Sequence, residues 1–240
     1  MDYRYTAIVL KKREMGETDR IYTFYTEEQG KIQAIGKGVR KPEAKLASAL
    51  ETLSSADIMV VRTRGIGKVA GAVLERSFSH LRSDYGTLTQ VLEAVSMLER
   101  MVDLEEEDRE LFSLLLTFLE TGEKVMKEKK VEKIPLLVEA FYYKMLSHLG
   151  YELELARCTV TGEKLVAGEQ FILSPSAGGV VTQTGTAEVR DGLAVSENVI
   201  KLLRLFYTQS IEKMEKISIS PDDLRQLIRF RRLFLQWIKH

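Results

Sequence analysis

The stretch that decides the fold of the amino-terminal region is KIQAI at residues 31–35, followed after one glycine by the loop KGVRKPEAKL at residues 37–46. The first part alternates polar and apolar side chains, which predicts a β-strand. The second part carries four cations in nine residues, with Gly38 able to turn the backbone and Pro42 restricting it. A cationic loop that leaves the end of a strand suits a phosphate backbone, although a solvated surface loop without a ligand has the same composition.

Outward from this stretch, the rest of residues 1–80 also predicts strands. Segments rich in β-branched and aromatic residues, or alternating in polarity, lie at residues 5–10, 21–26, 56–61 and 68–73. We expect a charged connection with a glycine turn at residues 13–20, and a tight hairpin turn at residues 28–31. Five short strands in about eighty residues predict a small closed barrel such as the OB-fold, a frequent binder of single strands.

From about residue 85 the apolar period changes from two to 3.6, which predicts helices. One apolar stripe lies within residues 88–102, a second follows the acidic run at 105–108, and a third helix runs from Pro135 to Gly150. Residues 151–196 lose this period, and helices return at 197–207 and 222–239. The last helix has Ser220 as its N-cap and carries Arg225, Arg229 and Arg232 roughly on one face, where they are either solvated or in contact with a partner or DNA.

The charge of the chain is divided along its length, although 35 Lys and Arg balance 35 Asp and Glu. Residues 1–80 have 14 basic against 10 acidic side chains, residues 81–155 have 9 against 16, and residues 156–240 have 12 against 9. Only some surfaces are therefore expected to meet a polyanion. With no long apolar run, no signal peptide and one cysteine, we expect a cytoplasmic protein without disulfides or a membrane partner.

No catalytic constellation is readable. The three histidines are scattered, and no Gly-x-Ser-x-Gly motif occurs. The segment GIGKV at residues 65–69 lacks the spacer and the hydroxyl residue of a phosphate loop, so a turn between strands explains it. Cys158 has no histidine beside it in sequence. We therefore expect neither an enzyme nor a cofactor.

Short segments of the chain nevertheless form a recognisable set. The amino-terminal region contains, in this order, AIVL (7–10), GETDR (16–20), YT (25–26), GK (30–31) and KGVRKP (37–42). The later chain contains LGY (149–151), Cys158 and GGV (178–180). Together and in this order they resemble the bacterial recombination mediator family RecO over essentially the full length.

The resemblance implies an α+β multidomain fold. Its expected parts are a DNA-binding OB-fold barrel at residues 1–80, a helical domain at 81–155, a small zinc-finger-like insertion at 156–196, and carboxy-terminal helices at 197–240 that complete the helical domain. It further implies binding and annealing of single-stranded DNA, with double-stranded DNA also bound, in the cytoplasm and at the nucleoid. The implied protein partners are RecR, the acidic carboxy-terminal tail of single-strand binding protein, and RecA indirectly.

One departure concerns the metal of the insertion. Many family members have two Cys-x-x-Cys pairs, whereas the matching positions here are Cys158, Thr161, Thr182 and Gly185. A structural zinc site needs four sulfur or imidazole ligands, so we expect no zinc here. Turns and the packing of Phe171, Leu173 and Val181 would then have to hold the insertion together.

The favoured hypothesis is a mediator whose cationic barrel edge grips phosphates. Its expected DNA-binding residues are Arg13, Arg20, Lys37, Arg40, Lys41, Lys45, Arg62, Arg64 and Lys68. Of the aromatic residues on the second strand, Tyr22, Phe24 and Tyr25, some are expected to stack on bases and others, Phe24 first, to fill the core. For protein partners, an apolar groove edged by cations such as Arg229 or Arg232 would accept an acidic peptide with a hydrophobic end. The alternative is an adaptor that binds no DNA and uses the barrel and a helical groove for protein partners.

Overall fold

The structure is a computed structural model that describes residues 2–40, 46–62, 65–182 and 189–239. The chain divides into two compact units, residues 1–131 and 132–240, and each is described by itself. The boundary falls inside the helical segment expected at residues 81–155, so the first two helices belong to the unit that contains the barrel.

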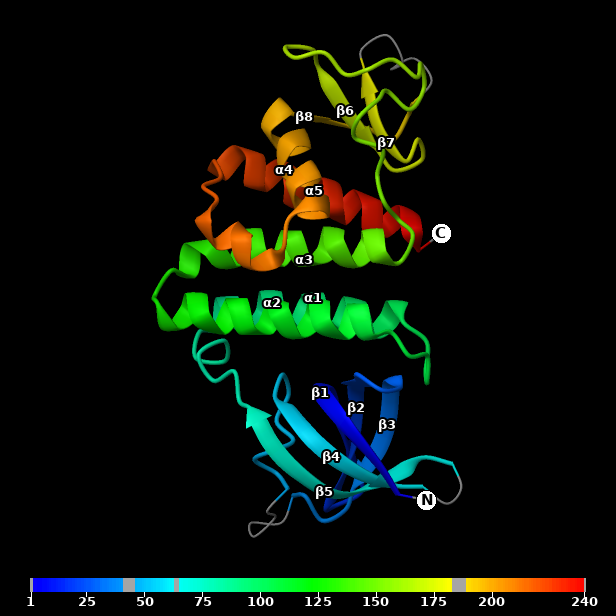
Figure 1. The fold of residues 1–240 in the computed structure, drawn as a ribbon, viewed down its shortest axis with the longest axis vertical. Helices are drawn as coiled ribbons and strands as arrows, with labels where there is room; N and C mark the ends of the chain where they lie inside the picture. Colours follow the sequence, from blue (N-terminus) through cyan, green and yellow to red (C-terminus); the bar gives the residue numbers. More distant parts are fainter. Residues whose placement is uncertain (1, 41–45, 63–64, 183–188, 240) are drawn as a thin grey trace. The chain divides into compact units, whose positions relative to one another are not determined.

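The first unit contains the predicted barrel (Figure 1). Its strands are β1 (Asp2–Met15), β2 (Asp19–Thr26), β3 (Gly30–Gly36), β4 (Ser55–Val61) and β5 (Gly67–Arg76). They close in the order β1-β2-β3-β5-β4, with a short parallel pairing of β3 and β5 and antiparallel pairings elsewhere. The interior is filled by alternate side chains of these strands, among them Val9, Phe24, Ile32 and Ile58.

The charged connection expected at residues 13–20 is wrong in its extent. β1 continues to Met15 and β2 begins at Asp19, and the opposed pairs Glu14–Arg20 and Met15–Asp19 extend the ladder through most of that segment. Only a short turn remains, in which Gly16 has a positive φ of 63°. Cross-strand pairing therefore decides the length of these strands, because charged side chains are tolerated on the outer face of a barrel.

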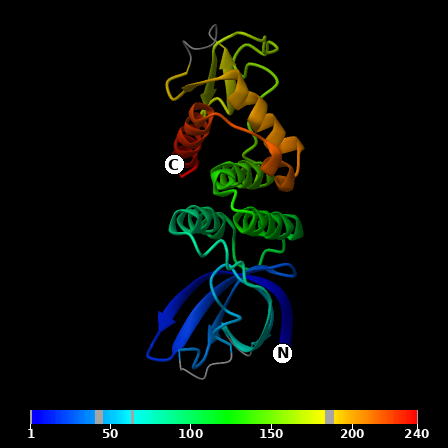
Figure 2. The same cartoon turned by 90° about the vertical axis from the view of Figure 1, so that its left-hand side faces the viewer.

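Two helices follow the barrel in the first unit, and Figure 2 shows them next to one another. They are α1 (Tyr85–Met101) and α2 (Arg109–Lys127), and Asp84 and Asp108 accept the backbone N–H of the third residue beyond them as N-caps. The Thr87 hydroxyl donates to Met126 Sδ at 3.5 Å, which joins the two helices. Phe112 of α2 stacks on Tyr25 of β2 with ring centroids 6.5 Å apart, so α2 covers part of the barrel wall.

The second unit is built from helices and a small sheet. Its elements are α3 (Ile134–His148), preceded by the 3-10 turn η1 (Val131–Lys133), then β6 (Phe171–Ser174), β7 (Gly179–Thr182), β8 (Leu193–Val195), α4 (Glu197–Thr208), the 3-10 helix η3 (Ile211–Lys216) and α5 (Pro221–Ile238). The sheet order is β7-β6-β8. The hairpin of β6 and β7 agrees with the predicted strand broken by a turn, whereas β8 was not predicted because only three residues form it.

A buried ion pair lies between α3 and α5. Glu139 has 1% of its surface exposed, and both its carboxylate oxygens accept hydrogen bonds from Arg231 Nε at 2.9 and 3.0 Å. The Arg231 guanidinium also lies 4.1 Å from the centroid of the Tyr142 ring. Burial raises the pKa of Glu139 to about 7, although the Arg231 charge opposes this. Of the arginines on α5, Arg231 thus serves the packing of this unit.

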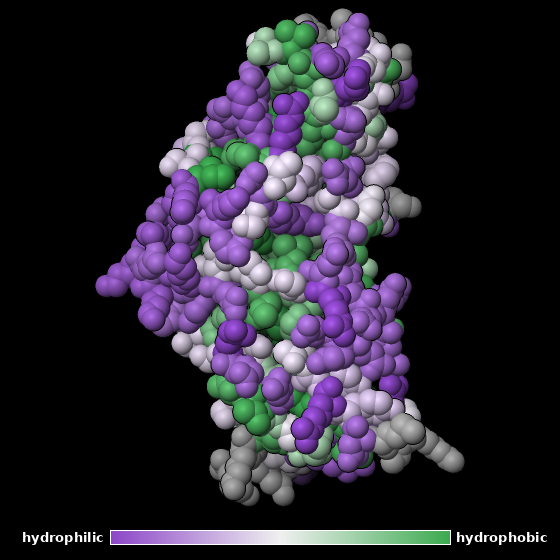
Figure 3. Space-filling model, in the orientation of Figure 1, coloured by the Kyte–Doolittle hydropathy of each residue, from purple (hydrophilic) through white to green (hydrophobic). Residues whose placement is uncertain are grey.

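No helix in the described part of the chain is both long and apolar enough to span a membrane. In the view of Figure 3 the surface is mostly hydrophilic, and hydrophobic side chains reach it in separate patches. On the barrel, Val73 and Leu74 of β5 are among the exposed large hydrophobic residues. Scattered exposure of this kind is common on folded proteins and does not by itself mark a site.

Candidate nucleic-acid interface and arginine groove

The outer face of the barrel presents a row of side chains that crosses four strands. Arg13 on β1 lies opposite Ile21 on β2, Ile21 opposite Ile35 on β3, and Ile35 opposite Lys68 on β5. Directly opposed residues project to the same face of a sheet. Arg13 and Lys68 are exposed and the two isoleucines are half-buried, so the row has a cation at each end and an apolar middle.

Lys11 belongs to this face and was missed from the sequence. It is exposed and lies two residues before Arg13 on β1, opposite Thr23 of β2. A period of two along the strand could have indicated it, because residues at i and i+2 share a face. The outer face of β1 thus presents two cations rather than one.

The cationic loop after β3 packs against the turn between β1 and β2. The backbone N–H of Gly38 donates to Asp19 Oδ1 at 2.8 Å, and that of Arg40 donates to the Thr18 carbonyl at 3.1 Å. The Arg40 guanidinium lies 3.5 Å from Glu14 Oε2. Lys37 and Arg40 are therefore held near the β1–β2 turn, next to which Arg20 lies opposite Gly36.

We call Lys11, Arg13, Lys37, Arg40 and Lys68 the cationic barrel face. Arg20, another predicted contact, is adjacent to Ile21 on β2 and therefore projects to the opposite face of the strand, that of Tyr22. Of the other predicted contacts, Arg62 is described but lies in an ion pair with Glu105, and its Nε donates to the Gly65 carbonyl at 2.8 Å. Lys41, Lys45 and Arg64 lie outside the described residues. A face of five cations from β1, β5 and one loop can follow several phosphates of a nucleic-acid strand.

The expectation that an aromatic residue of the second strand stacks on bases is wrong. Tyr22 and Phe24 are fully buried inside the barrel, with ring centroids 5.7 Å apart. Tyr25 points to the outside of the barrel, but α2 covers it and leaves 1% of its surface exposed. The alternation along β2 was read correctly, whereas the cover over Tyr25 comes from a helix more than eighty residues later in the chain.

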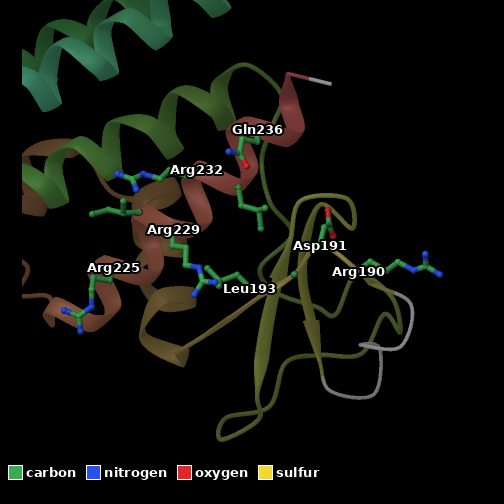
Figure 4. A pocket seen from close by; sticks show the side chains of 10 residues that line it. Arg190, Asp191, Leu193, Arg225, Arg229, Arg232 and Gln236 are labelled. Atoms are coloured by element: carbon green, nitrogen blue, oxygen red, sulfur yellow. The ribbon is translucent and has the colours of Figure 1, made fainter.

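In the second unit, the three predicted arginines of α5 line a cavity of about 690 Å³ (Figure 4). Its other lining residues come from α5 and from the segment that leads into β8. We call the whole set the arginine groove: Arg190, Asp191, Gly192, Leu193, Arg225, Ile228, Arg229, Arg232, Leu233 and Gln236. Arg225, Arg229 and Arg232 are all exposed, as predicted.

The arginine groove combines an apolar lining with a strong positive charge. Leu193, Ile228 and Leu233 supply the apolar surface. Asp191 is the one carboxylate in the set, and it already accepts hydrogen bonds from Ser174 Oγ at 2.7 Å and from Ser176 N at 3.0 Å. Burial alone would raise the pKa of Asp191, but the hydrogen bonds stabilise its carboxylate more strongly, so the net effect is a lowered pKa. The groove can therefore hold an acidic ligand that also has an apolar part.

Of the four positions that match the metal ligands of the insertion, the three that the structure describes lie around one sulfur atom. Cys158 Sγ is buried and accepts hydrogen bonds from the backbone N–H of Thr161 at 3.5 Å and of Thr182 at 3.4 Å. Gly185 lies outside the described residues. Burial would raise the pKa of Cys158, but hydrogen bonds from both threonines lower it to about 6. One sulfur beside two threonines does not fit zinc, and no cluster of three metal-binding side chains occurs among the described residues.

Comparison with known proteins agrees with the resemblance in the sequence. The family model described as "Recombination protein O N terminal" matches residues 1–78, and "Recombination protein O C terminal" matches residues 82–238. A protein named DNA repair protein RecO from Desulfitobacterium hafniense (strain DSM 10664 / DCB-2) is 30% identical over 98% of this chain and 84% of its own length.

Two further relatives carry the same name. The one from Dehalococcoides mccartyi (strain ATCC BAA-2266 / KCTC 15142 / 195) is 27% identical over 94% of this chain and 86% of its own length. The one from Roseiflexus sp. (strain RS-1) is 28% identical over 98% of this chain and 81% of its own length. With both family models spanning nearly the whole sequence, the chain belongs to the RecO family of DNA repair proteins.

Proposed function

We propose that this chain is a recombination mediator that binds and anneals single-stranded DNA. The observation that carries the proposal is the cationic barrel face, in which Arg13 and Lys68 flank the half-buried pair Ile21 and Ile35 and three further cations come from β1 and the loop after β3. Phosphates bind the cations, and bases in an unpaired strand can pack on the aliphatic middle of the row. Double-stranded DNA would use the phosphate contacts alone.

Annealing by such a face needs no nucleotide hydrolysis and no catalytic residue. Two complementary strands repel one another through their phosphates, and neutralisation of this charge allows them to approach and pair. The protein contributes a surface rather than a reaction step, which agrees with the absence of a phosphate-loop motif from the sequence. We therefore propose a non-enzymatic role at the nucleoid, in the cytoplasm.

The arginine groove supports a second part of the proposal. We propose that it takes the acidic carboxy-terminal tail of single-strand binding protein, with Arg225, Arg229 and Arg232 holding carboxylates and Leu193, Ile228 and Leu233 holding the apolar end. With RecR as a further partner, the chain would then help to load RecA onto strands coated by single-strand binding protein. The membership in the RecO family of DNA repair proteins supports a repair context for these partners.

The test is fluorescence anisotropy of a labelled oligonucleotide, titrated across salt with and without a chelator. We expect tight binding at low salt that weakens steeply as salt rises and ignores the chelator. Binding that is absent at low salt, or insensitive to salt, would favour the adaptor that contacts proteins only. In that case the family membership would speak for the fold and the repair context but not for DNA contact by this chain.

A further inference from the structure

The connection between α1 and α2 is seated on the barrel by its backbone. Leu104 forms a parallel bridge with Lys31 of β3, and the backbone N–H of Glu105 donates to the Lys31 carbonyl at 2.8 Å. Lys31 Nζ in turn donates to the Glu99 carbonyl at the end of α1, also at 2.8 Å. The acidic run that precedes α2 is thus fixed against the edge of β3.

Gly30 makes this close seating possible. A Cβ at that position would lie 1.8 Å from the Glu106 carbonyl oxygen, well inside contact distance, and Gly30 also has a positive φ of 62°. Only glycine satisfies both conditions without a shift of the backbone. The connection therefore has one defined position on the barrel.

This position directs Glu105 at Arg62. Glu105 itself adopts the left-handed conformation, with φ 62°, which a residue other than glycine keeps only where its surroundings impose it. Its carboxylate accepts a hydrogen bond from Arg62 Nη1 in the connection between β4 and β5. The two side chains are 42% and 41% exposed, so solvent and solutes can reach the pair.

We infer that Glu105 is a built-in competitor for phosphate that withholds Arg62 from DNA until a strand displaces it. The inference rests on the proposed function, because it concerns the same barrel. A carboxylate and a phosphate oxygen compete for the same guanidinium through the same charge-assisted hydrogen bonds. An exposed ion pair of this kind costs little to open, so displacement is within reach of a bound strand.

The consequence is a lower affinity for DNA than the number of barrel cations implies. Arg62 can contact a phosphate only when its ion pair with Glu105 is broken. The free energy gained from the phosphate contact is therefore reduced by the free energy lost with the ion pair. A protein that brings two strands together and then leaves the duplex benefits from such a limit, because release is part of each cycle. Glu105 thereby moderates affinity without touching DNA.

The experiment compares three variants by oligonucleotide anisotropy across salt. In Glu105→Gln, Arg62 loses its carboxylate partner, and we expect affinity at low salt to rise about two- to fivefold and the salt slope to steepen by about 0.7. Glu107→Gln is the matched control, because it removes the same charge from the same run but from a carboxylate that pairs with Arg109 Nε at 2.9 Å. It should leave the slope unchanged. Glu105→Gln on an Arg62→Ala background should bring no gain.

Three outcomes would overturn the inference. They are no gain in Glu105→Gln, an equal gain in Glu107→Gln, or a gain that persists without Arg62. Thermal unfolding of each variant verifies that the fold is kept. Failure of the proposed function has a different signature, since neither the wild type nor any of these variants would then bind the oligonucleotide in a salt-dependent way, and the inference would fall with it.

Discussion

At the scale of single residues, Cys158 shows how hydrogen bonds from the backbone favour the charged form of a buried sulfur. Its buried sulfur accepts two backbone N–H groups, and its backbone carbonyl accepts the N–H of Gly162 at 2.9 Å. Such hydrogen bonds favour the thiolate over the thiol, which is why the pKa of Cys158 lies near 6 although the site is buried. A group whose pKa is lower in the folded state stabilises the protein more as pH rises.

The first prediction follows from this dependence of stability on pH. Cys158 titrates near 6 when folded and near its ordinary value of 9.0 when unfolded. Its contribution is therefore fully present above pH 9, declines below it, and is lost as pH falls through 6. In urea unfolding, the free energy of unfolding of wild type relative to that of Cys158→Ser should increase by on the order of 1 kcal/mol between pH 6 and pH 7.5. A chelator should change the free energy of unfolding of neither protein. If the difference in stability between wild type and Cys158→Ser does not change with pH, the sulfur is a thiol throughout this range.

A second residue-scale prediction concerns Gly30. Alanine there would meet the Glu106 carbonyl as well as the positive φ, whereas alanine at Gly16 would meet the positive φ of 63° with no atom within 4 Å. We expect Gly16→Ala to lower the free energy of unfolding by about 1 kcal/mol and Gly30→Ala by at least about twice as much. Chemical denaturation measures both. Equal losses would mean that the α1–α2 connection shifts away from the added Cβ at no further cost in stability.

At the scale of elements, two segments far apart in sequence form the end of the cationic barrel face. The loop that begins at Lys37 is held to the β1–β2 turn through the Gly38–Asp19 and Arg40–Thr18 hydrogen bonds. This contact places the loop cations next to the β1–β2 turn, at one end of the cationic barrel face. The phosphate path would run over both.

Substitution of the loop cations tests this placement. Lys37→Ala with Arg40→Ala should weaken single-strand binding and flatten the salt slope by about 1.4, because two phosphate contacts are lost. The fold should persist, since the hydrogen bonds that anchor the loop use backbone N–H groups. Lys201→Ala with Lys213→Ala, two exposed cations on α4 and η3, is the control and should leave the slope as in wild type. An unchanged slope in the loop variant would remove the loop from the DNA footprint.

At the scale of the whole molecule, the two units carry separate cationic surfaces. The cationic barrel face lies in the unit of residues 1–131, and the arginine groove lies in the unit of residues 132–240. The first offers a strip of cations suited to a strand, and the second offers a cavity with an apolar lining suited to a peptide. We therefore expect DNA binding and tail binding to be separable.

Reversal of charge in the groove tests this separation. Arg229→Glu with Arg232→Glu should abolish binding of an acidic peptide with a hydrophobic carboxy-terminal residue, measured by anisotropy of the labelled peptide. The same variant should keep the salt slope of the barrel for single-stranded DNA. A peptide that lacks its final hydrophobic residue is the matched ligand control and should bind wild type weakly. If the variant binds the intact peptide as wild type does, the groove is not the tail site.

The sequence alone determined the elements and the outer cations of this protein. Within the described part of the chain, periods of two and 3.6 located the five barrel strands and the five α-helices, and the Ser220 cap and the exposed α5 arginines were predicted correctly. These signals are local, because a strand or helix repeats its faces within a few residues. The cationic character of residues 37–40 is likewise visible in the chain itself.

Only the tertiary structure decided which of those residues are available. Arg62 is engaged by Glu105, 43 residues later, and Arg231 is buried against Glu139, 92 residues earlier. Tyr25 is covered by Phe112 of a helix that the strand pattern does not reveal. Each of these contacts joins segments that are distant in sequence, so it depends on how faces pack together rather than on the period of either segment.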